Sequence, residues 1–218
     1  MENSAAYLSY IVPVFAFLTT FLFQKYFLSR GIIDNINNRS SHKVIATRSG
    51  GISIFFPVGV ISIIFYIIGV ELFDYSILVS LFLLFMIGLY DDLYNVDFKL
   101  KFIFQIIAAK ILIDNGYIID NFHGVFGFYE IGRIYAQIFT IFIIVSIINS
   151  INFIDGIDGL ALTYTLKFII LFEFFQSSES IFKILSLIVG LSILPLLYFN
   201  FKKTKKVFLG DSGSLFLG

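Results

Sequence analysis

The sequence has no cysteine and few charged residues. Only 14% of its 218 residues are Asp, Glu, Lys or Arg, whereas soluble globular domains contain about a quarter. The lack of cysteine excludes disulfides and thiolate metal sites, and two histidines on opposite sides of the expected membrane do not favour a histidine-based zinc site. No Lys or Arg precedes the first apolar run, so a cleaved signal peptide is not expected. With a mean hydropathy of +0.94, the composition indicates an integral membrane protein in contact with membrane lipids, and no nucleic-acid partner is expected.

Apolar runs fill most of the chain. A bilayer-crossing helix needs about 20 residues, and runs of that order predict seven complete transmembrane helices. An eighth begins near Ser214. The predicted fold class is therefore an all-α polytopic integral membrane protein, with one domain over 1–218 and no visible soluble domain or repeat. The predicted spans are 6–28, 51–70, 75–90, 101–119, 131–148, 160–176 and 181–200.

The basic residues divide the connections between spans into two sets. Because successive spans cross the membrane in alternating directions, the connections 29–50, 91–100, 149–159 and 201–213 lie on one side, where Lys and Arg are frequent. The connections on the other side contain no Lys or Arg. Because Lys and Arg accumulate on the cytoplasmic side, the first set is predicted to be cytoplasmic and the amino terminus to be outside. The segment 117–130 mixes aromatic residues, β-branched residues and glycine, and it predicts a short outer hairpin.

One polar stretch, NSINFIDGIDGLA from Asn149 to Ala161, interrupts two strongly apolar runs. Asp155 and Asp158 are three residues apart, so if the segment opens a helix, both lie on one face of its first turn, where negative charge is stabilised. Gly156 and Gly159 leave the backbone uncovered, which permits close approach of a ligand. The plainer alternative is a polar turn that caps the next helix.

Acidic residues also lie at other cytoplasmic span ends, giving five in all: Asp91, Asp92, Asp155, Asp158 and Asp211. Carboxylates crowded at one membrane face need a compensating cation, and Mg²⁺ prefers carboxylate oxygens together with substrate phosphates and waters. Lys101 starts a span within reach of the same face, and Arg48 or the lysines at 202–206 could hold phosphates. Backbone NH groups at the helix start beside Asp211 could contact a phosphate as well. The alternative for the lysines is that they set topology and meet lipid headgroups.

Two other classes of protein compete with a phosphate-handling enzyme. Acidic residues in a polytopic protein commonly mark the ion pathway of a transporter, although transporters tend to place them near the bilayer midplane and to show internal repeats. A catalytically inactive fragment is the other alternative. No P-loop, dinucleotide-binding fingerprint or EF-hand spacing is present.

Taken together, the cytoplasmic loops resemble those of the polyprenyl-phosphate N-acetylhexosamine-1-phosphate transferases, of glycosyltransferase family 4 type. These enzymes initiate O-antigen and teichoic-acid synthesis and are related to the peptidoglycan translocase. Nearly the whole chain is covered by four collinear motifs: Arg39-Ser40-Ser41-His42 with Arg48 and Gly50-Gly51; Asp91-Asp92 with Lys101; Asn149, Asn152, Asp155-Gly156 and Asp158-Gly159-Leu160; and Gly210-Asp211-Ser212-Gly213-Ser214-Leu215.

The resemblance implies that a UDP-N-acetylhexosamine and undecaprenyl phosphate give a lipid-linked sugar diphosphate and UMP. It further implies Mg²⁺, with Mn²⁺ as a substitute, and a bacterial inner-membrane location with a cytoplasmic active site. It is also compatible with a homodimer. The implied metal ligands are Asp211, Asp91 and Asp92. The implied catalytic residues are Asp91, Asp92, Lys101, Asp155 and Asp158. The implied substrate-binding residues are His42, Arg48, Asn149, Asn152, Gly156 and Gly159.

Two features depart from the family. Ile45-Ala46-Thr47 replaces the usual Pro-Thr-Pro, which predicts a less rigid first loop. Members of the family also continue past the position of Gly218 into further spans and a histidine-rich loop, so the chain is expected to be truncated at its carboxyl terminus. The first loop is similar to the branch that uses FucNAc or QuiNAc, and GlcNAc stays open as the donor sugar.

Overall fold

The computed structural model describes residues 2–34, 44–69, 74–175 and 182–218. They form eight α-helices, one short 3-10 turn at Val125–Gly127 and two very short strands, β1 (Ala46–Thr47) and β2 (Lys206–Val207). The helices are α1 (Glu2–Ser29), α2 (Gly50–Ile67), α3 (Ser76–Tyr94), α4 (Phe98–Asp114), α5 (Arg133–Ile154), α6 (Leu160–Phe175), α7 (Lys183–Asn200) and α8 (Gly210–Leu217). Because each long apolar run satisfies its backbone hydrogen bonds internally as a helix, the predicted helical class is confirmed.

Five helices in the described ranges are long and apolar enough to cross a membrane: residues 10–29 of α1, and all of α2, α3, α5 and α7. This confirms a polytopic membrane protein. The helices α4 and α6 have 17 and 16 residues; α6 matches the predicted span 160–176 to within one residue, and α4 overlaps the predicted span 101–119 but ends five residues earlier. The count of seven spans and the orientation remain predictions.

The predicted boundaries differ from the helix ends by up to six residues, and two of the differences involve site residues. The predicted span 131–148 ends too early, because α5 continues through the polar residues Asn149 and Asn152 to Ile154. The last helix begins at Gly210, four residues before the predicted Ser214. In both places polar side chains find partners inside the protein, so the helix can extend beyond the apolar run.

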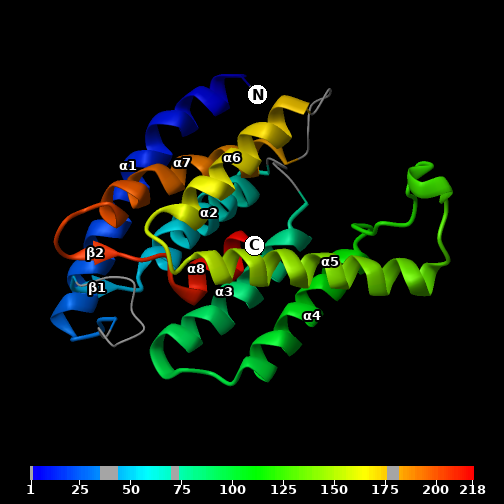
Figure 1. Ribbon diagram of the computed structural model, residues 1–218. Helices are drawn as coiled ribbons and strands as arrows, with labels where there is room; N and C mark the ends of the chain where they lie inside the picture. The colour runs from blue at the N-terminus through cyan, green and yellow to red at the C-terminus, as the bar shows by residue number, and fades with distance from the viewer. Residues whose placement is uncertain (1, 35–43, 70–73, 176–181) are drawn as a thin grey trace.

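The short helix α8 lies in the centre of the bundle and packs against α2, α3 and α5 (Figure 1). Glycines allow this close approach: a Cβ atom added at Gly213 would lie 2.9 Å from the Cα atom of Gly51, and one at Gly88 would overlap the backbone of Asp211. Six of the eight residues of α8 are buried. The helix that carries Asp211 is therefore held from three sides.

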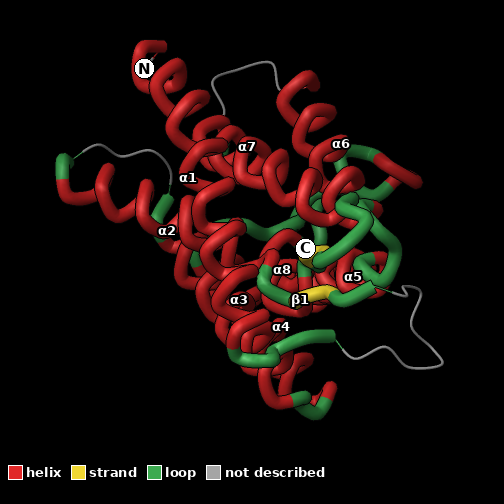
Figure 2. Tube along the Cα trace, turned by 90° about the vertical axis from the view of Figure 1, so that its left-hand side faces the viewer, coloured by secondary structure: helices red, strands yellow, loops and turns green. Residues whose placement is uncertain are grey.

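The first and last predicted cytoplasmic loops are joined by a two-stranded parallel sheet, a small exception to the all-α prediction. Ala46 pairs with Lys206 and Thr47 with Val207. The pairing continues toward α2, where the backbone NH groups of Gly50 and Gly51 donate to the carbonyls of Phe208 and Leu209 at 3.0 and 2.8 Å. Figure 1 shows the strand pair at the side of the helices, and Figure 2, which views that side, shows β1 in the middle of the view near the label of α8. The sheet fixes the entry of the chain into α8.

The segment between α4 and α5 forms the predicted hairpin. Asn121 and Glu130 make an antiparallel bridge, and the NH group of Phe122 donates to the carbonyl of Tyr129 at 2.8 Å. Figure 1 shows this hairpin projecting from the start of α5, apart from the other helices.

Candidate active site

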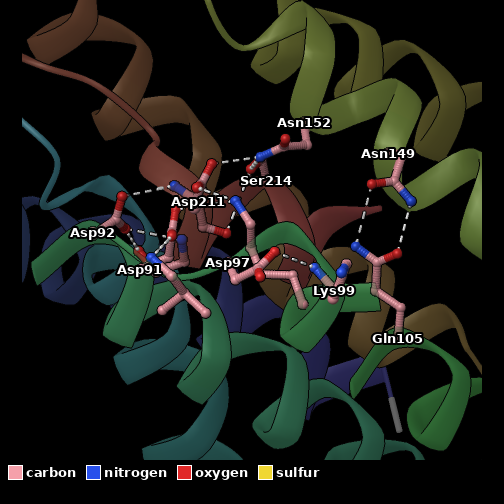
Figure 3. A network of polar contacts seen from close by, with 12 residues as sticks. Asp91, Asp92, Asp97, Lys99, Gln105, Asn149, Asn152, Asp211 and Ser214 are labelled. Atoms are coloured by element: carbon pink, nitrogen blue, oxygen red, sulfur yellow. Dashed lines mark hydrogen bonds and ion pairs between the residues drawn. The ribbon is translucent and has the colours of Figure 1, made fainter. Parts of the chain in front are cut away.

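Four helix ends bring the candidate residues together at one end of the bundle. Asp91 and Asp92 lie in the last turn of α3, and Lys101 lies in the first turn of α4. Asn152 and the capping residue Asp155 lie at the end of α5. Asp211 lies in the first turn of α8. Residues more than 100 positions apart in the sequence thus meet in one polar network (Figure 3).

Lys101 joins two of the aspartates. Its ammonium group lies 3.1 Å from Oδ2 of Asp91 and 3.0 Å from Oδ2 of Asp211. Burial would raise the pKa of Asp211, but hydrogen bonding with Asp91 and Lys101 outweighs burial and lowers the pKa below its ordinary value. Asp211 is therefore held in its ionised form, which is the form that binds cations.

The start of α8 is capped by carboxylates of other helices. Oδ1 of Asp92 accepts from the NH group of Asp211 at 2.9 Å, and Oδ2 of Asp92 accepts from the NH group and the hydroxyl of Ser212 at 2.9 and 2.7 Å. Asp155 accepts from the NH group of Gly210 at 3.1 Å. The expectation that these NH groups contact a phosphate is therefore wrong for this structure, because the protein's own carboxylates satisfy the positive end of the helix.

Two layers of polar contacts connect α5 to its neighbours, the first to α8 and the second to α4. In the first, the amide of Asn152 donates to Oδ1 of Asp211 at 2.5 Å and to the hydroxyl of Ser214 at 2.8 Å. In the second, Gln105 and Asn149 exchange amide hydrogen bonds of 2.7 and 3.3 Å (Figure 3). Residues of both layers line a cavity of about 170 Å³ between α4, α5 and α8, together with Phe98, Lys101, Phe102 and Leu215.

Asp155 and Arg48 complete the charged surroundings. Burial, followed by the negative charges of Asp92 and Asp211, raises the pKa of Asp155 to about 7. Arg48 donates to Asp34 at 2.7 Å. Although burial opposes the charge of Arg48, the nearby carboxylates of Asp34 and Asp92 hold its pKa above the ordinary value. The carboxylates of Asp92, Asp155 and Asp211 thus lie close together. An added cation would reduce the repulsion between their negative charges.

The polar stretch after α5 differs from its predicted form. Asp155 caps the end of α5, and Asp158 lies in the turn before α6, so the two do not share the first turn of a helix. Asp158 instead pairs with Lys206. Gly159 has a φ of +69° and faces the ring of Phe201, where a Cβ atom would overlap it. A Cβ atom added at Gly156 would meet no other atom within 4 Å. Close approach of a ligand at Gly156 therefore remains a prediction.

One predicted substrate-binding residue, His42, lies outside the described residues, as do Arg39, Ser40 and Ser41. Two residues of the network were not singled out from the sequence. Gln105 follows Lys101 by four positions, so its place on the same helix face was a usable signal. No feature of the sequence indicated that Asp34 belongs to the site, because its side chain reaches Arg48 only when the first loop is folded.

The carboxylates fit a magnesium ion under one condition. In the described part of the chain, no three His, Asp or Glu side chains converge to hold a metal by themselves. Mg²⁺, however, usually takes one or two carboxylates and completes its shell with waters and substrate phosphates. Asp91 and Asp211 both face the ammonium of Lys101, so the space between them already suits a cation. Asp92 uses its oxygens to cap α8, whereas Asp91 and Asp211 each direct one oxygen at the ammonium of Lys101, whose place a metal could take. Asp211 and Asp91 are therefore the better pair.

Comparisons with known proteins agree with the geometry. The profile of the family described as glycosyl transferase family 4 matches residues 75–218, which contain the whole network except Asp34 and Arg48. A curated protein of Bacillus subtilis strain 168, named probable undecaprenyl-phosphate N-acetylglucosaminyl 1-phosphate transferase, is 33% identical over 194 residues. The match covers 86% of this chain and 53% of that protein, so the chain spans about half the length of this relative.

Proposed function

The chain belongs to glycosyl transferase family 4, and on this premise we propose that it transfers an N-acetylhexosamine 1-phosphate from a UDP-sugar to undecaprenyl phosphate. One observation carries the proposal. The Asp91–Lys101–Asp211 bridge and Asn152 stand beside a cavity at the ends of membrane helices. A lipid phosphate and a water-soluble nucleotide sugar can meet only at such a level of the membrane.

The reaction exchanges one phosphoanhydride bond for another. An oxygen of the lipid phosphate forms a bond to the phosphorus that carries the sugar, and the bond from that phosphorus to UMP breaks. Phosphoryl transfer of this kind depends mainly on positioning and on neutralising charge. The site residues are suited to both tasks, because cationic and amide groups converge beside the carboxylates.

We assign roles from the contacts. Asp211 and Asp91 would hold Mg²⁺ or Mn²⁺, which when bound neutralises phosphate charge. Lys101 balances the two carboxylates and can contact a phosphate once they engage a metal. Asn152 fixes the orientation of Asp211. Asp92 and Asp155 position α8 through its NH groups.

The remaining candidate residues extend the site. Arg48, Asp158 and Gly156 border it on the side of the first and last loops, where the nucleotide sugar would lie. We place this side in the cytoplasm, because Lys and Arg gather there. His42 is kept as a substrate-binding candidate from its motif, and a homodimer is kept as a possible assembly. Because the relative's name specifies N-acetylglucosamine, GlcNAc is the first donor sugar to test, with FucNAc and QuiNAc next. The resemblance of the loop motifs to the O-antigen branch supports a role in O-antigen-like envelope synthesis.

A transporter is less well supported. Its acidic residues would be expected near the bilayer midplane, whereas Asp91, Asp155 and Asp211 all lie at helix ends. The inactive-fragment alternative is decided by the activity of the chain itself.

The test is release of UMP from membranes that contain the protein, supplied with undecaprenyl phosphate and one UDP-N-acetylhexosamine at a time. We expect release with one donor in Mg²⁺, and its loss in EDTA and in Asp211→Asn. The matched control is Asp114→Asn at the other end of α4, where Asp114 pairs only with exposed Lys110. That variant should release UMP at the wild-type rate.

Two outcomes would contradict the proposal. UMP release by Asp211→Asn at the wild-type rate would remove Asp211 from the mechanism. Absence of release with every donor, from protein shown to be folded and membrane-inserted, would support the inactive alternative for this chain.

A further inference from the structure

The surface farthest from the carboxylates is an apolar one, formed by the hairpin 117–131 and the first half of α5. The 22 residues of α5 span about 33 Å, close to the ~30 Å thickness of a bilayer's hydrocarbon core. Since Asp155 caps one end of α5, the hairpin at the other end lies at the opposite membrane face.

The hairpin is firmly fixed to α5. The NH group of Ile119 donates to the hydroxyl of Thr140 at 2.9 Å, and the rings of Phe122 and Phe139 meet edge to face at 5.2 Å. Thr140 lies seven residues into α5, about 10 Å along its axis. The base of the hairpin therefore lies beside the membrane span and does not stand beyond it.

The tip of the hairpin presents aromatic side chains and no charge. Phe126 is 94% exposed, and Val125, Phe128 and Tyr129 are also exposed. No Asp, Glu, Lys or Arg occurs between Phe122 and Tyr129. Phe126 has a φ of +54°, uncommon for a residue other than glycine. If this turn held the phenyl ring of Phe126 in water, the exposed apolar surface of the ring would cost free energy.

An apolar groove of about 410 Å³ connects the hairpin to the helix. It is lined by Phe122 and Ile131 of the hairpin and by Tyr135, Ile138, Phe139 and Phe142 of α5. Tyr135, Ile138 and Phe142 are exposed apolar or aromatic side chains on a candidate membrane span, a position that suits contact with lipid. The groove is thus continuous with a lipid-facing surface.

The geometry points to a lipid-docking hairpin: its aromatic tip inserts at the headgroup–acyl boundary of the adjacent leaflet, and a phospholipid acyl chain fills the groove. Aromatic rings concentrate at this depth in membrane proteins. The hairpin then steadies the start of α5, whose other end carries Asn149 and Asn152.

The chain has no tryptophan, so a single substitution creates a unique fluorescent reporter. Phe126→Trp is placed in vesicles of phosphatidylcholine and phosphatidylglycerol, and then in vesicles whose acyl chains are brominated. We expect the tryptophan of Phe126→Trp to emit at blue-shifted wavelengths. Brominated lipid should reduce its fluorescence intensity about as much as it reduces that of Ile138→Trp, on the exposed side of α5. Lys203→Trp, in the exposed loop after α7, is the reference for weak quenching.

A second variant tests the aromatic tip itself. Phe126→Trp combined with Phe128→Ser and Tyr129→Ser should shift the emission to the red and lose most of the quenching by brominated lipid. Because these side chains are exposed, the substitutions should leave folding intact. Red-shifted Phe126→Trp emission that iodide quenches, and brominated lipid does not, would overturn the inference in favour of a tip in water. Blue-shifted emission that neither quencher reaches would overturn it in favour of a protein contact.

Discussion

The two ends of α5 belong to one continuous helix but lie in different surroundings. At its carboxyl end, Asn149, Asn152 and Asp155 contact α4 and α8 through side-chain hydrogen bonds. At its amino end, Tyr135 and Ile138 are exposed on a candidate membrane span. The comparison shows that the apolar half of a helix satisfies its backbone internally and needs few side-chain hydrogen bonds, whereas a polar helix end needs fixed partners from elsewhere in the chain.

The same contrast holds across the molecule. The carboxylate end is built on close backbone contacts at Gly51, Gly88 and Gly213, while the opposite end has exposed aromatic residues and an open groove. We therefore expect substitutions at the carboxylate end to have the larger effects. Substitutions at both ends, each compared with a matched control, test this difference.

The largest effect is expected for Gly51→Ala in α2. The added Cβ atom would overlap the backbone of α8, and overpacking of this kind typically costs about 1–3 kcal/mol, and more where backbone must move. We expect the thermal unfolding midpoint in detergent to fall by many degrees, or no folded protein to be obtained. The control is Gly59→Ala in the same helix, where the nearest atom would be at 3.9 Å. Equal losses from both substitutions would contradict the tight packing of α8.

The second effect contrasts the two ends of α4. Lys101→Met removes the cation between Asp91 and Asp211 and leaves two partly buried carboxylates uncompensated, at a cost of about 3 kcal/mol. Lys110→Met removes an exposed pair with Asp114, worth about 0–1 kcal/mol. Unfolding measured without divalent cations should separate the two variants, and excess Mg²⁺ should recover part of the loss in Lys101→Met only. Indistinguishable stabilities would show that Lys101 is not the compensating cation.

The third effect depends on pH. The pKa of Asp155 is raised in the folded protein to about 7 from its ordinary value of 3.8. The folded state therefore binds more protons than the unfolded state between these values, and stability must fall as the pH rises through that window. In EDTA we expect Asp155 to contribute a loss of roughly 2 kcal/mol between about pH 5 and pH 7, so Asp155→Asn should make the pH dependence clearly shallower.

The opposite membrane end supplies the control for this pH effect. Backbone and side-chain hydrogen bonds from Ser76 lower the pKa of Asp74 below its ordinary value, so Asp74 stays ionised throughout the window. Asp74→Asn should leave the slope unchanged. A wild-type slope that survives in Asp155→Asn would assign the titration to another group.

The smallest effect is expected at the hairpin. Thr140→Val removes the hydroxyl that accepts from the NH group of Ile119, and loss of one such hydrogen bond costs about 1 kcal/mol. Ser150→Ala in the same helix removes only a hydrogen bond to the carbonyl of Ser146 on its exposed side, and it should be nearly neutral. Hydrogen exchange at Ile119 should rise in Thr140→Val alone, and unchanged protection there would contradict a hairpin fixed by Thr140.

Much of the fold and part of the site could be predicted from the sequence. The apolar runs located the helices to within a few residues, and the hairpin at 117–130 was recognisable from its composition. Alternation of the spans placed Asp91, Asp92, Asp155 and Asp211 at one end, where the structure brings them together. Lys101 was expected at the same face and contacts two of them.

Other features could not be predicted, because they depend on contacts between distant segments. Asp158 looked equivalent to Asp155, but the path of the last loop places Lys206 beside it. The NH groups of α8 looked available to a phosphate, but Asp92 and Asp155 reach them from α3 and α5. The residues around Ala46 and Lys206 did not predict that these two segments pair as strands.

The sequence by itself determined a helical membrane protein with five aspartates at one set of helix ends, because hydrophobicity and charge act on each segment separately. Only the tertiary structure decided which carboxylates bind Lys101, which cap α8 and which pair elsewhere. These choices depend on distances of about 3 Å between side chains from different helices, and such distances are fixed by how the helices pack around α8.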